Sequence, residues 1–471
     1  MDRFVNTTFR WWWNLIIQLA LLTVGFLSAC SYTFGTKIIS IILWPAVGMS
    51  GIAFLYRFVH LKMYAKSKLI WLMAAFICSF GISTLLNYRY GWYSNVVSLV
   101  WTGILFFVFY CYRSDESANG KIKNFTVLSV FYIFITSILC IASFIVWIKG
   151  LNIYYIPETG PRYYIGFFWG RLYGVFWDPN IGAVMCVIGA VLACGLIPRY
   201  KAFLLRFLLS ISIVLDYLFI LFSGSRAGKL AFCVGVSMLC LLLLLKRQRW
   251  YLAVIVAFFA VILVYFSFSG AKTLYNSLVT YIDIVEEEKQ ETKHEVKQEE
   301  NGKGNENKED LLRRNDNVSD ISNRRFDIWK AGLQILKKNP IFGIGHANVV
   351  NYVKENIPDS YLINNDYMVF SSMHNGYLDV LLSQGIVGFG IYIAMALKAL
   401  IILIKNWKEI ELRMGGIAEV QFTLLFVLMG TCLVISEVLF VTSPMSTMFW
   451  ISLGALMSAT NSKKGKEEIK E

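Results

Sequence analysis

The sequence predicts an all-α polytopic membrane protein with about 12 transmembrane helices and one large extracytoplasmic loop. Hydrophobic residues make up 57% of the 471 residues, and the mean hydropathy is +0.56. Charged residues make up only 16%, whereas a soluble chain carries about 25%. Apolar runs of about 20 residues, the length that crosses the hydrocarbon core of a bilayer, recur from one end of the chain to the other.

The apolar runs are separated by short polar segments, except for one long connection between the ninth and tenth runs. The first run lacks a small-residue cleavage site and is long enough to span, so we expect no cleavable signal peptide. Two of the runs could instead be re-entrant. The predicted spans are residues 12–31, 38–58, 69–87, 94–112, 125–148, 179–197, 203–222, 228–245, 250–269, 376–404, 418–438 and 445–460.

Lysine and arginine are concentrated in every second connection, which orients the helices. With the N-terminus inside, the inner segments carry roughly 22 of these residues and the short outer loops carry seven. We therefore expect a multi-pass protein of the cytoplasmic membrane with both termini in the cytoplasm. The net charge of +13 is then mostly an inner rim that faces anionic lipid, and not a nucleic-acid site. The seven outer residues are Lys37, Arg89, Lys149, Arg162, Arg171, Arg226 and Lys229.

The nine cysteines lie within the predicted spans, apart from Cys111 at an inner helix end. None of them lies in the large outer loop. We therefore expect neither a disulfide framework nor a thiolate metal site.

The spans divide the chain into five regions, of which the third is the large outer loop. Its centre, residues 284–323, is rich in Glu, Lys, Gln and Asn and has too little apolar surface to fold, so we predict a disordered insert or a frayed helix. The regions are an N-terminal bundle of five spans (1–148), a motif-bearing membrane region (149–269) that begins with an outer loop (149–178), the large extracytoplasmic loop (270–375), the C-terminal spans (376–460) and a basic cytoplasmic tail (461–471).

Two helix boundaries stand out on the outer side. The aromatic loop 149–178 ends in Asp178-Pro179, where the proline fits the first turn of the sixth span and the aspartate is expected to cap it. An amphipathic helix is predicted over residues 324–338, and it must stop at Asn339 because the residue before a proline avoids helical geometry. Its apolar residues recur at spacings of three and four and so share one face. They are Phe326, Trp329, Leu333 and Leu336.

Arginines on the outer side are candidates for binding an anionic substrate. Arg226 lies in a short break between two spans, in Ser225-Arg226-Ala-Gly228, which places it at the outer membrane edge. It could be a snorkelling arginine that contacts lipid phosphates, or it could bind a diphosphate, whose oxygens fit the guanidinium fork. Arg325 on the amphipathic helix is open to the same two interpretations, and Arg171 lies on the same side.

His374, at the outer start of the tenth span, is the candidate proton acceptor, because imidazole changes charge near neutral pH. A lone histidine at a helix end could equally be an ordinary polar cap. Of the other three, His346 follows a glycine turn, His60 is on the inner side and His294 lies in the insert.

Three carboxylates within spans, Asp216, Asp379 and Glu437, lie nearer the outer side. Intramembrane carboxylates are functional candidates, although these three could simply pair with the arginines. The sequence has no Asp-rich cluster and no HExxH pattern, and it offers only two usable outer histidines, so we expect no metal and no other cofactor. It has no Walker A motif, so we expect no direct use of ATP.

Four passages of the sequence form a set whose order and spacing are familiar. They are Arg171 to Asn180, Ser225 to Gly228, Arg325 to Trp329 with Asn339-Pro340-Ile-Phe-Gly343-Ile-Gly345, and His374-Asn375-Gly376-Tyr377-Leu378 with Gly385 and Gly388 beyond. Together with the large loop before the tenth span, the set resembles the O-antigen ligase and O-antigen polymerase superfamily of bacterial membrane glycosyltransferases. The resemblance covers residues 170–390, and the first five spans match only in hydropathy.

The resemblance implies a helical fold of the GT-C type. It implies transfer of a sugar chain from undecaprenyl diphosphate to an acceptor hydroxyl on the outer face, without a metal or a nucleotide sugar. Arg226 and Arg325 would bind the donor diphosphate with Arg171 in support, and His374 would accept the proton of the hydroxyl or orient it. The insert at 284–323 departs from the family pattern. The supporting residues implied are Asn180, Ser225, Asn375 and Trp329.

We expect a polysaccharide polymerase that lengthens the repeat units of a capsule, an exopolysaccharide or an O-antigen. Two guanidinium groups would stabilise the charge on the leaving diphosphate, and attack from the opposite side would invert the anomeric configuration. A ligase that moves finished glycan to a lipid or protein acceptor is the alternative, and a lipid-linked oligosaccharide flippase is an alternative of another class. The expected partners are an undecaprenyl-diphosphate-linked oligosaccharide, the lipid bilayer and, from the same pathway, a chain-length regulator and a flippase.

Overall fold

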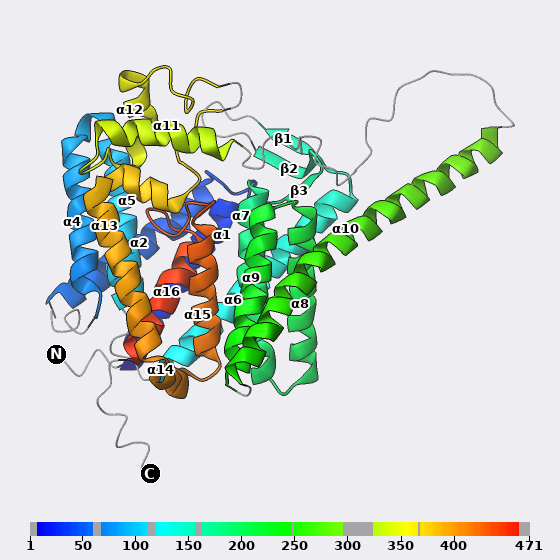
Figure 1. Cartoon of the computed structure of the whole chain (residues 1–471), viewed down its shortest axis with the longest axis horizontal. Helices are drawn as coiled ribbons and strands as arrows, with labels where there is room; N and C mark the ends of the chain where they lie inside the picture. Colours follow the sequence, from blue (N-terminus) through cyan, green and yellow to red (C-terminus); the bar gives the residue numbers. More distant parts are fainter. Residues whose placement is uncertain are drawn as a thin grey trace, which may run out of the picture.

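Helices make up most of the structure, a computed structural model, and one small antiparallel sheet completes it (Figure 1). The structure describes residues 7–59, 67–111, 118–155, 163–246, 249–294, 324–365 and 368–460. His60, the part of the predicted insert after residue 294 and the predicted tail 461–471 lie outside the described residues.

Among the described residues, nine helical segments are long and apolar enough to cross a membrane. This confirms a polytopic, mostly helical membrane protein. The π-helix η2 continues α5, and the short 3-10 helix η4 (Ile197–Arg199) follows α7. The helices that form these segments are α1 (Thr7–Ala29), α2 (Lys37–Val59), α5 (Trp92–Gly103) with η2 (Ile104–Tyr110), α6 (Ala118–Ile148), α7 (Pro179–Leu196), α8 (Phe203–Phe222), α9 (Arg226–Leu244), α10 (Trp250–His294) and α13 (Gly376–Lys405).

The other three predicted spans are shorter helices, so a total of twelve crossings stays a prediction. They are α4 (Ile70–Leu86), α15 (Ile417–Thr431) and α16 (Pro444–Ala459), with 17, 15 and 16 residues. Helix α15 ends at Thr431 and not near residue 438 as predicted, and an irregular loop, residues 432–443, leads to α16. The loop ends where Ser443 caps α16 and Pro444 occupies its first turn.

Five short elements lie outside the long helices. The 3-10 helix η1 (Tyr88–Tyr90) joins α4 to α5. Helix α11 (Arg325–Lys338), η5 (His346–Asn348) and α12 (Val349–Asn356) follow one another before α13, and α14 (Trp407–Met414) follows it. Helices α11 and α12 lie at the same end of the bundle as the sheet, and α14 lies at the opposite end (Figure 1). We call the end that carries α11, α12 and the sheet the sheet end.

The sheet was not foreseen in the all-α prediction, which left the aromatic loop 149–178 without secondary structure. Strands β1 (Ile153–Tyr155), β2 (Tyr163–Phe168) and β3 (Arg171–Gly174) pair antiparallel in sequence order. Trp169 and Gly170 form the β2–β3 turn, both with positive φ (53° and 68°), as in the two-residue hairpin turns whose twist matches the strands. Aromatic residues favour strands, so the same composition that made the loop unusual explains the sheet.

Helix α7 lies at the centre of the membrane bundle. In its span 78% of the residues are buried, against 17% for α2 and α10. Small residues allow this, since a Cβ at Gly182, Gly189 or Gly195 would come within 3 Å of a neighbouring side chain. A central helix of this kind holds its N-terminus in a fixed position, which matters for the site described below.

Helix α11 confirms the predicted amphipathic helix and ends before Asn339 as predicted. Its packed face overlaps the predicted one only in part, since Trp329 and Leu336 pack against the core and the other two predicted residues do not. Phe326 and Leu333, both on the predicted apolar face, are 66% and 45% exposed. The packed face includes Gly332, whose Cβ would lie 2.6 Å from the sulfur of Met373. Small residues on α11 let this helix approach α13 closely. A search for large apolar residues at helical spacing does not find such small residues. The buried residues of α11 are Ile328, Ala331, Gly332 and Ile335.

Helix α13 is broken at Gly385, which has φ 63° and ψ −163°. The break lets the segment after α11 pair with α13 through backbone hydrogen bonds. Ile344 and Gly345 donate to the carbonyls of Leu382 and Ser383 (both 2.9 Å), and beyond the break Ile386 donates to Pro340 (2.8 Å). A Cβ at Gly385 would lie 2.3 Å from the carbonyl of Ile341, and one at Gly343, also at positive φ (65°), would lie 2.3 Å from that of Leu382.

We therefore expect Gly385→Ala and Gly343→Ala to destabilise the protein, each by more than about 2 kcal/mol, because each adds left-handed strain to a backbone clash. The apparent midpoint of thermal unfolding in detergent measures this. Gly390→Ala is the matched control, since Gly390 lies further along α13 with no atom within 4 Å of its Cβ position. Equal midpoints for Gly385→Ala and Gly390→Ala would contradict the packing described here.

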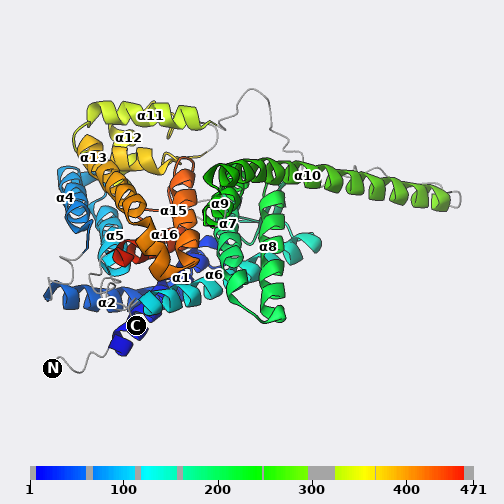
Figure 2. The same cartoon turned by 60° about the horizontal axis from the view of Figure 1, so that its bottom comes forward.

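Helix α10 runs without interruption through residue 269, where the sequence placed the start of the outer loop, and on to His294. It extends beyond the body of the bundle in both views (Figures 1 and 2). The first part of the predicted insert, residues 284–294, is therefore helical.

Candidate functional site

The N-termini of α7 and α9 are joined by side chains at the sheet end. The Asp178 carboxylate caps α7 by accepting a hydrogen bond from the Asn180 amide (2.6 Å), as the sequence predicted. The Ser225 hydroxyl caps α9 by accepting from the Gly228 amide (3.0 Å), and it donates to Asn180 Oδ1 (3.0 Å). Each helix N-terminus carries a partial positive charge that favours a bound anion.

Arg171, the first residue of β3, is fixed against this junction. Its Nε donates to the carbonyl of Ser223 (2.7 Å) and its Nη2 donates to Asn180 Oδ1 (2.9 Å). Burial lowers the pKa of Arg171, and the nearby cations of Arg325 and Arg226 lower it further, whereas Tyr173 and Asp178 raise it. A guanidinium stays charged under any such shift. The structure thus brings Arg171, Arg226 and Arg325 into one electrostatic neighbourhood.

Arg226 and Arg325 are each the first residue of a helix, α9 and α11. Arg226 is exposed and Arg325 is half-buried. The Nη2 of Arg325 donates to the carbonyl of Val434 (3.4 Å) in the loop 432–443. Two arginines at helix starts place their charge where the helix dipoles already favour an anion.

His374 lies in a strained turn that several side chains hold in place. Its φ is 47°, a left-handed conformation that is uncommon outside glycine and is concentrated at functional sites. Its amide donates to the Ser372 hydroxyl (3.1 Å), which in turn donates to Asp379 Oδ2 (2.7 Å). Asp379 Oδ1 accepts from the Met373 amide (2.8 Å), and Trp329 Nε1 donates to the Met373 carbonyl (3.0 Å).

Asn375 starts α13 next to this turn. Its Oδ1 caps the helix by accepting from the amides of Tyr377 (3.1 Å) and Leu378 (3.2 Å). The Gly376 amide donates to the carbonyl of Cys432 (2.7 Å), which ties the helix start to the loop 432–443. Trp329 and Asn375, predicted as supporting residues, therefore fix the backbone on either side of His374.

The charges around His374 connect the turn to the arginines. Burial lowers the pKa of His374 and the Arg325 cation lowers it further, whereas Asp178 and Asp379 raise it. His374 is nonetheless exposed to solvent, so we expect its pKa to be lowered less than that of a fully enclosed imidazole. With a pKa below 6.5 the imidazole is mostly neutral at neutral pH and can accept a proton.

Four residues that the fold brings to this site had no site role predicted from the sequence. Asp178 was predicted only as a cap, and Asp379 only as an intramembrane carboxylate. Glu437 lies in the loop 432–443, outside the helices, where burial, together with Asp178, raises its pKa to about 7. His346 stacks on Phe440 (4.4 Å between ring centroids), and burial lowers its pKa while Asp379 raises it. The sequence signals for Asp379 were its place within a predicted span and its position five residues after His374.

The fold and the site define a multi-pass helical membrane protein with a cationic, histidine-bearing site among helix N-termini. Residues 207–393 match the family model described as O-antigen ligase. The match covers Arg226, Arg325 and His374, and it confirms the predicted resemblance to the O-antigen ligase and polymerase superfamily.

An uncharacterized protein of Haemophilus influenzae is 32% identical over 82 residues. This similarity covers 17% of the present chain and 20% of that protein. The chain therefore matches about one fifth of the length of this relative.

Proposed function

We propose that the protein is a polysaccharide polymerase. It transfers a glycan chain from undecaprenyl diphosphate to a sugar hydroxyl of a lipid-linked repeat unit. The observation that supports this is the gathering of three arginines and two capped helix N-termini beside a neutral imidazole. The proposal places the sheet end on the outer side of the cytoplasmic membrane and both chain termini inside, in agreement with the distribution of lysine and arginine.

The donor diphosphate binds to Arg226 and Arg325. As the bond to the anomeric carbon breaks, negative charge grows on the diphosphate, and groups already fixed in place stabilise that charge without reorganisation. Arg171 cannot turn freely toward the substrate, because its Nε and Nη2 donate to Ser223 and Asn180. Its role is to add positive charge and to hold the α7–α9 junction.

The acceptor hydroxyl is activated by His374. A neutral imidazole accepts the hydroxyl proton as the oxygen attacks the anomeric carbon, opposite to the leaving diphosphate, and the transfer inverts the configuration. Asp379 fixes the turn through Ser372 and the Met373 amide, which holds the imidazole in position. Neither a metal nor another cofactor has a step in this mechanism.

The aromatic sheet gives the growing glycan a surface next to Arg171. Sugar rings present apolar faces that pack on aromatic rings whose edges remain in water. Trp169 is 55% exposed at the hairpin tip, and its ring lies 4.6 Å from that of Tyr164, which also contacts Tyr154 (5.4 Å). A tryptophan held at positive φ carries strain that a different residue would avoid, which favours a functional reason for its presence.

We expect Trp169→Asn to weaken acceptor binding by roughly fivefold, because asparagine removes the ring and tolerates the left-handed turn. The KM for a lipid-linked acceptor measures this, with the thermal midpoint as a check on folding. Trp169→Phe keeps an aromatic ring at the same strained position and should restore most of the binding. An unchanged KM in Trp169→Asn would contradict the proposal that the sheet binds the glycan.

The test of the proposed function uses the purified full chain in nanodiscs with a synthetic lipid-linked repeat unit. A polymerase produces a ladder of longer lipid-linked chains, seen by mass spectrometry. A ligase leaves the repeat units unextended and transfers finished glycan to a lipid or protein acceptor. Movement of the substrate across the bilayer without any new glycosidic bond would overturn both and favour a flippase.

In cells, a polymerase is expected to act together with other proteins of the same pathway. A polymerase requires a flippase to supply repeat units on the outer side, and a chain-length regulator sets the length of its products. Deletion of the gene in the native host should leave single repeat units on the surface lipid. Long chains in the deletion strain would contradict the polymerase proposal.

A further inference from the structure

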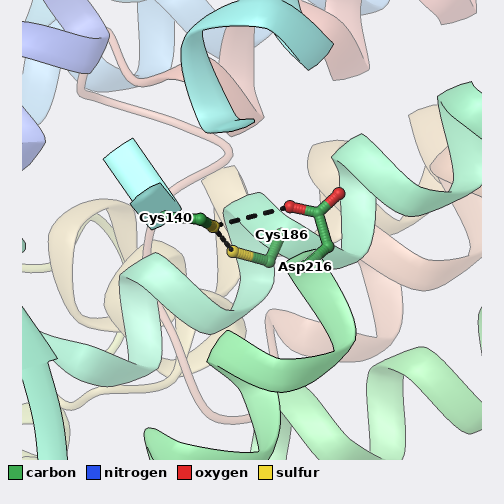
Figure 3. Close-up of side chains that lie close together, drawn as sticks. All are labelled: Cys140, Cys186 and Asp216. Atoms are coloured by element: carbon green, nitrogen blue, oxygen red, sulfur yellow. Dashed lines mark hydrogen bonds between the residues drawn. The ribbon is translucent and has the colours of Figure 1, made fainter. Parts of the chain in front are cut away.

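Three side chains from three neighbouring helices meet in the centre of the membrane bundle, although they lie far apart in sequence (Figure 3). Cys140 comes from α6, Cys186 from α7 and Asp216 from α8. The two sulfur atoms are 3.5 Å apart, and Cys140 Sγ lies 3.8 Å from Asp216 Oδ1. One ligand atom from each residue lies within 4.8 Å of the other two.

All three side chains are fully buried, with 0% exposure. A carboxyl group at that depth is costly unless it is neutral or bound to a cation. Among the hydrogen bonds of the described residues its only partner is the Cys140 thiol, on Oδ1, and Asp216 Oδ2 has no hydrogen-bond partner. One oxygen of this buried carboxylate, Oδ2, therefore receives no hydrogen bond from the described part of the protein.

Helix α7 makes room for the carboxylate. A Cβ at Gly189 would lie 2.7 Å from Asp216 Oδ2 and 3.0 Å from Thr136 Oγ1. Any other residue at position 189 would displace the carboxylate. The space beside Oδ2 thus depends on a glycine one turn after Cys186.

The spacing of the ligand atoms fits tetrahedral coordination. With Zn–S bonds of about 2.3 Å and Zn–O bonds of about 2.1 Å, two thiolates on one zinc ion lie about 3.8 Å apart, and a thiolate and a carboxylate oxygen about 3.6 Å apart. The observed separations of 3.5 and 3.8 Å need only small shifts to reach these values. A disulfide would instead require the sulfur atoms to approach to about 2.05 Å.

We propose that Cys140, Cys186 and Asp216 form a structural zinc site that joins α6, α7 and α8. The two thiolates and one carboxylate oxygen supply three ligands to the ion. The thiols and the carboxyl release their protons to solvent on binding. Because the site clamps the central helix α7, it fixes the position of Asp178 and Asn180 at the start of that helix.

The sequence alone predicts no thiolate metal site, because the cysteines are scattered among the spans and form no motif. Closely spaced pairs reveal zinc ligands within one loop or finger, whereas ligands from the middles of three helices leave no such pattern. Only the packing of α6 and α8 against α7 brings them together.

Elemental analysis of the full chain tests the proposal. The protein is purified in detergent with a streptavidin-binding tag, incubated with zinc chloride and passed over a desalting column. We expect about one zinc ion per wild-type chain and roughly tenfold less in Cys140→Ser, Cys186→Ser and Asp216→Asn. Cys233→Ser is the matched control, because Cys233 is equally buried, on α9, and belongs to no such cluster of the described residues.

A second measurement needs no substitution and therefore does not depend on the variants folding. Zinc should protect Cys140 and Cys186 of the wild type from a membrane-permeant maleimide, as seen by peptide mass spectrometry, and should leave labelling of Cys78 unchanged. Cobalt in place of zinc should give a thiolate-to-metal charge-transfer band that Cys233→Ser retains and Cys140→Ser loses. Wild-type protein that binds no more zinc than Cys140→Ser, or a Cys140–Cys186 disulfide in unreduced protein, would overturn the proposal.

Discussion

Replacing Arg226 with alanine should reduce chain elongation by roughly 10²- to 10³-fold, the effect expected for the loss of one fixed donor that stabilises developing negative charge. Arg226 starts α9, and its charge reaches Arg171. Its removal therefore takes away part of the positive field around the diphosphate while leaving the Ser225 cap of the helix in place. The rate of elongation with lipid-linked repeat units measures the effect.

Arg226→Lys separates charge from geometry. Lysine keeps the positive charge but lacks the planar fork that binds phosphate oxygens in pairs, so we expect a loss intermediate between wild type and alanine. Arg206→Ala is the control. Arg206 is an exposed arginine in the first turn of α8, and its Nε donates to the Tyr200 carbonyl (2.5 Å). If the elongation rate of Arg226→Ala lies within twofold of that of Arg206→Ala, Arg226 does not bind the donor diphosphate.

The helices of this protein could be predicted from the sequence because membrane burial leaves a local signal. A span needs a continuous apolar run, and each predicted run contains a helix in the structure. The caps were local as well, since Asp178-Pro179 and Asn339-Pro340 act through their immediate neighbours. The family motifs added Arg226, Arg325 and His374, which local chemistry alone had left between two interpretations.

What the sequence did not reveal depends on contacts between distant segments. The loop 432–443 lies in an apolar stretch that resembles a span, and its irregular form rests on partners such as Gly376 and Trp450, which bind the carbonyls of Cys432 and Val438. The packed face of α11 depends on Gly332 meeting Met373. The Cys140–Cys186–Asp216 cluster likewise exists only after three helices have packed.

The glycines of the motif set also act through contacts between segments that are distant in the sequence. Gly343 and Gly385 have a structural role at the contact between two backbone segments. They allow two backbones to touch where α13 breaks, and this contact fixes the segment that joins α11, which carries Arg325, to α13, which follows His374. Motif residues with no side chain therefore set the distance between the arginine and histidine parts of the site.

His374→Ala should lower the turnover of elongation by roughly 10²- to 10⁴-fold, the usual contribution of a positioned general base. The KM for the donor should change little, because the imidazole acts on the acceptor hydroxyl. Asp379→Asn keeps the size of the side chain but weakens its hold on Ser372 and the Met373 amide, so we expect a smaller loss of turnover. Equal turnover in wild type and His374→Ala would exclude His374 as the base.

The pH profile gives an independent test of the same role. Since burial lowers the pKa of His374, the neutral imidazole persists at neutral pH, and turnover should fall only as the pH drops below 6.5. Glu437, with a pKa of about 7, adds a second protonation in a similar range. Glu437→Gln removes that group, so an acidic limb that remains in this variant belongs to His374. If the limb below pH 6.5 disappears in Glu437→Gln, the titrating group is the glutamate, and the proton acceptor of the reaction lies elsewhere.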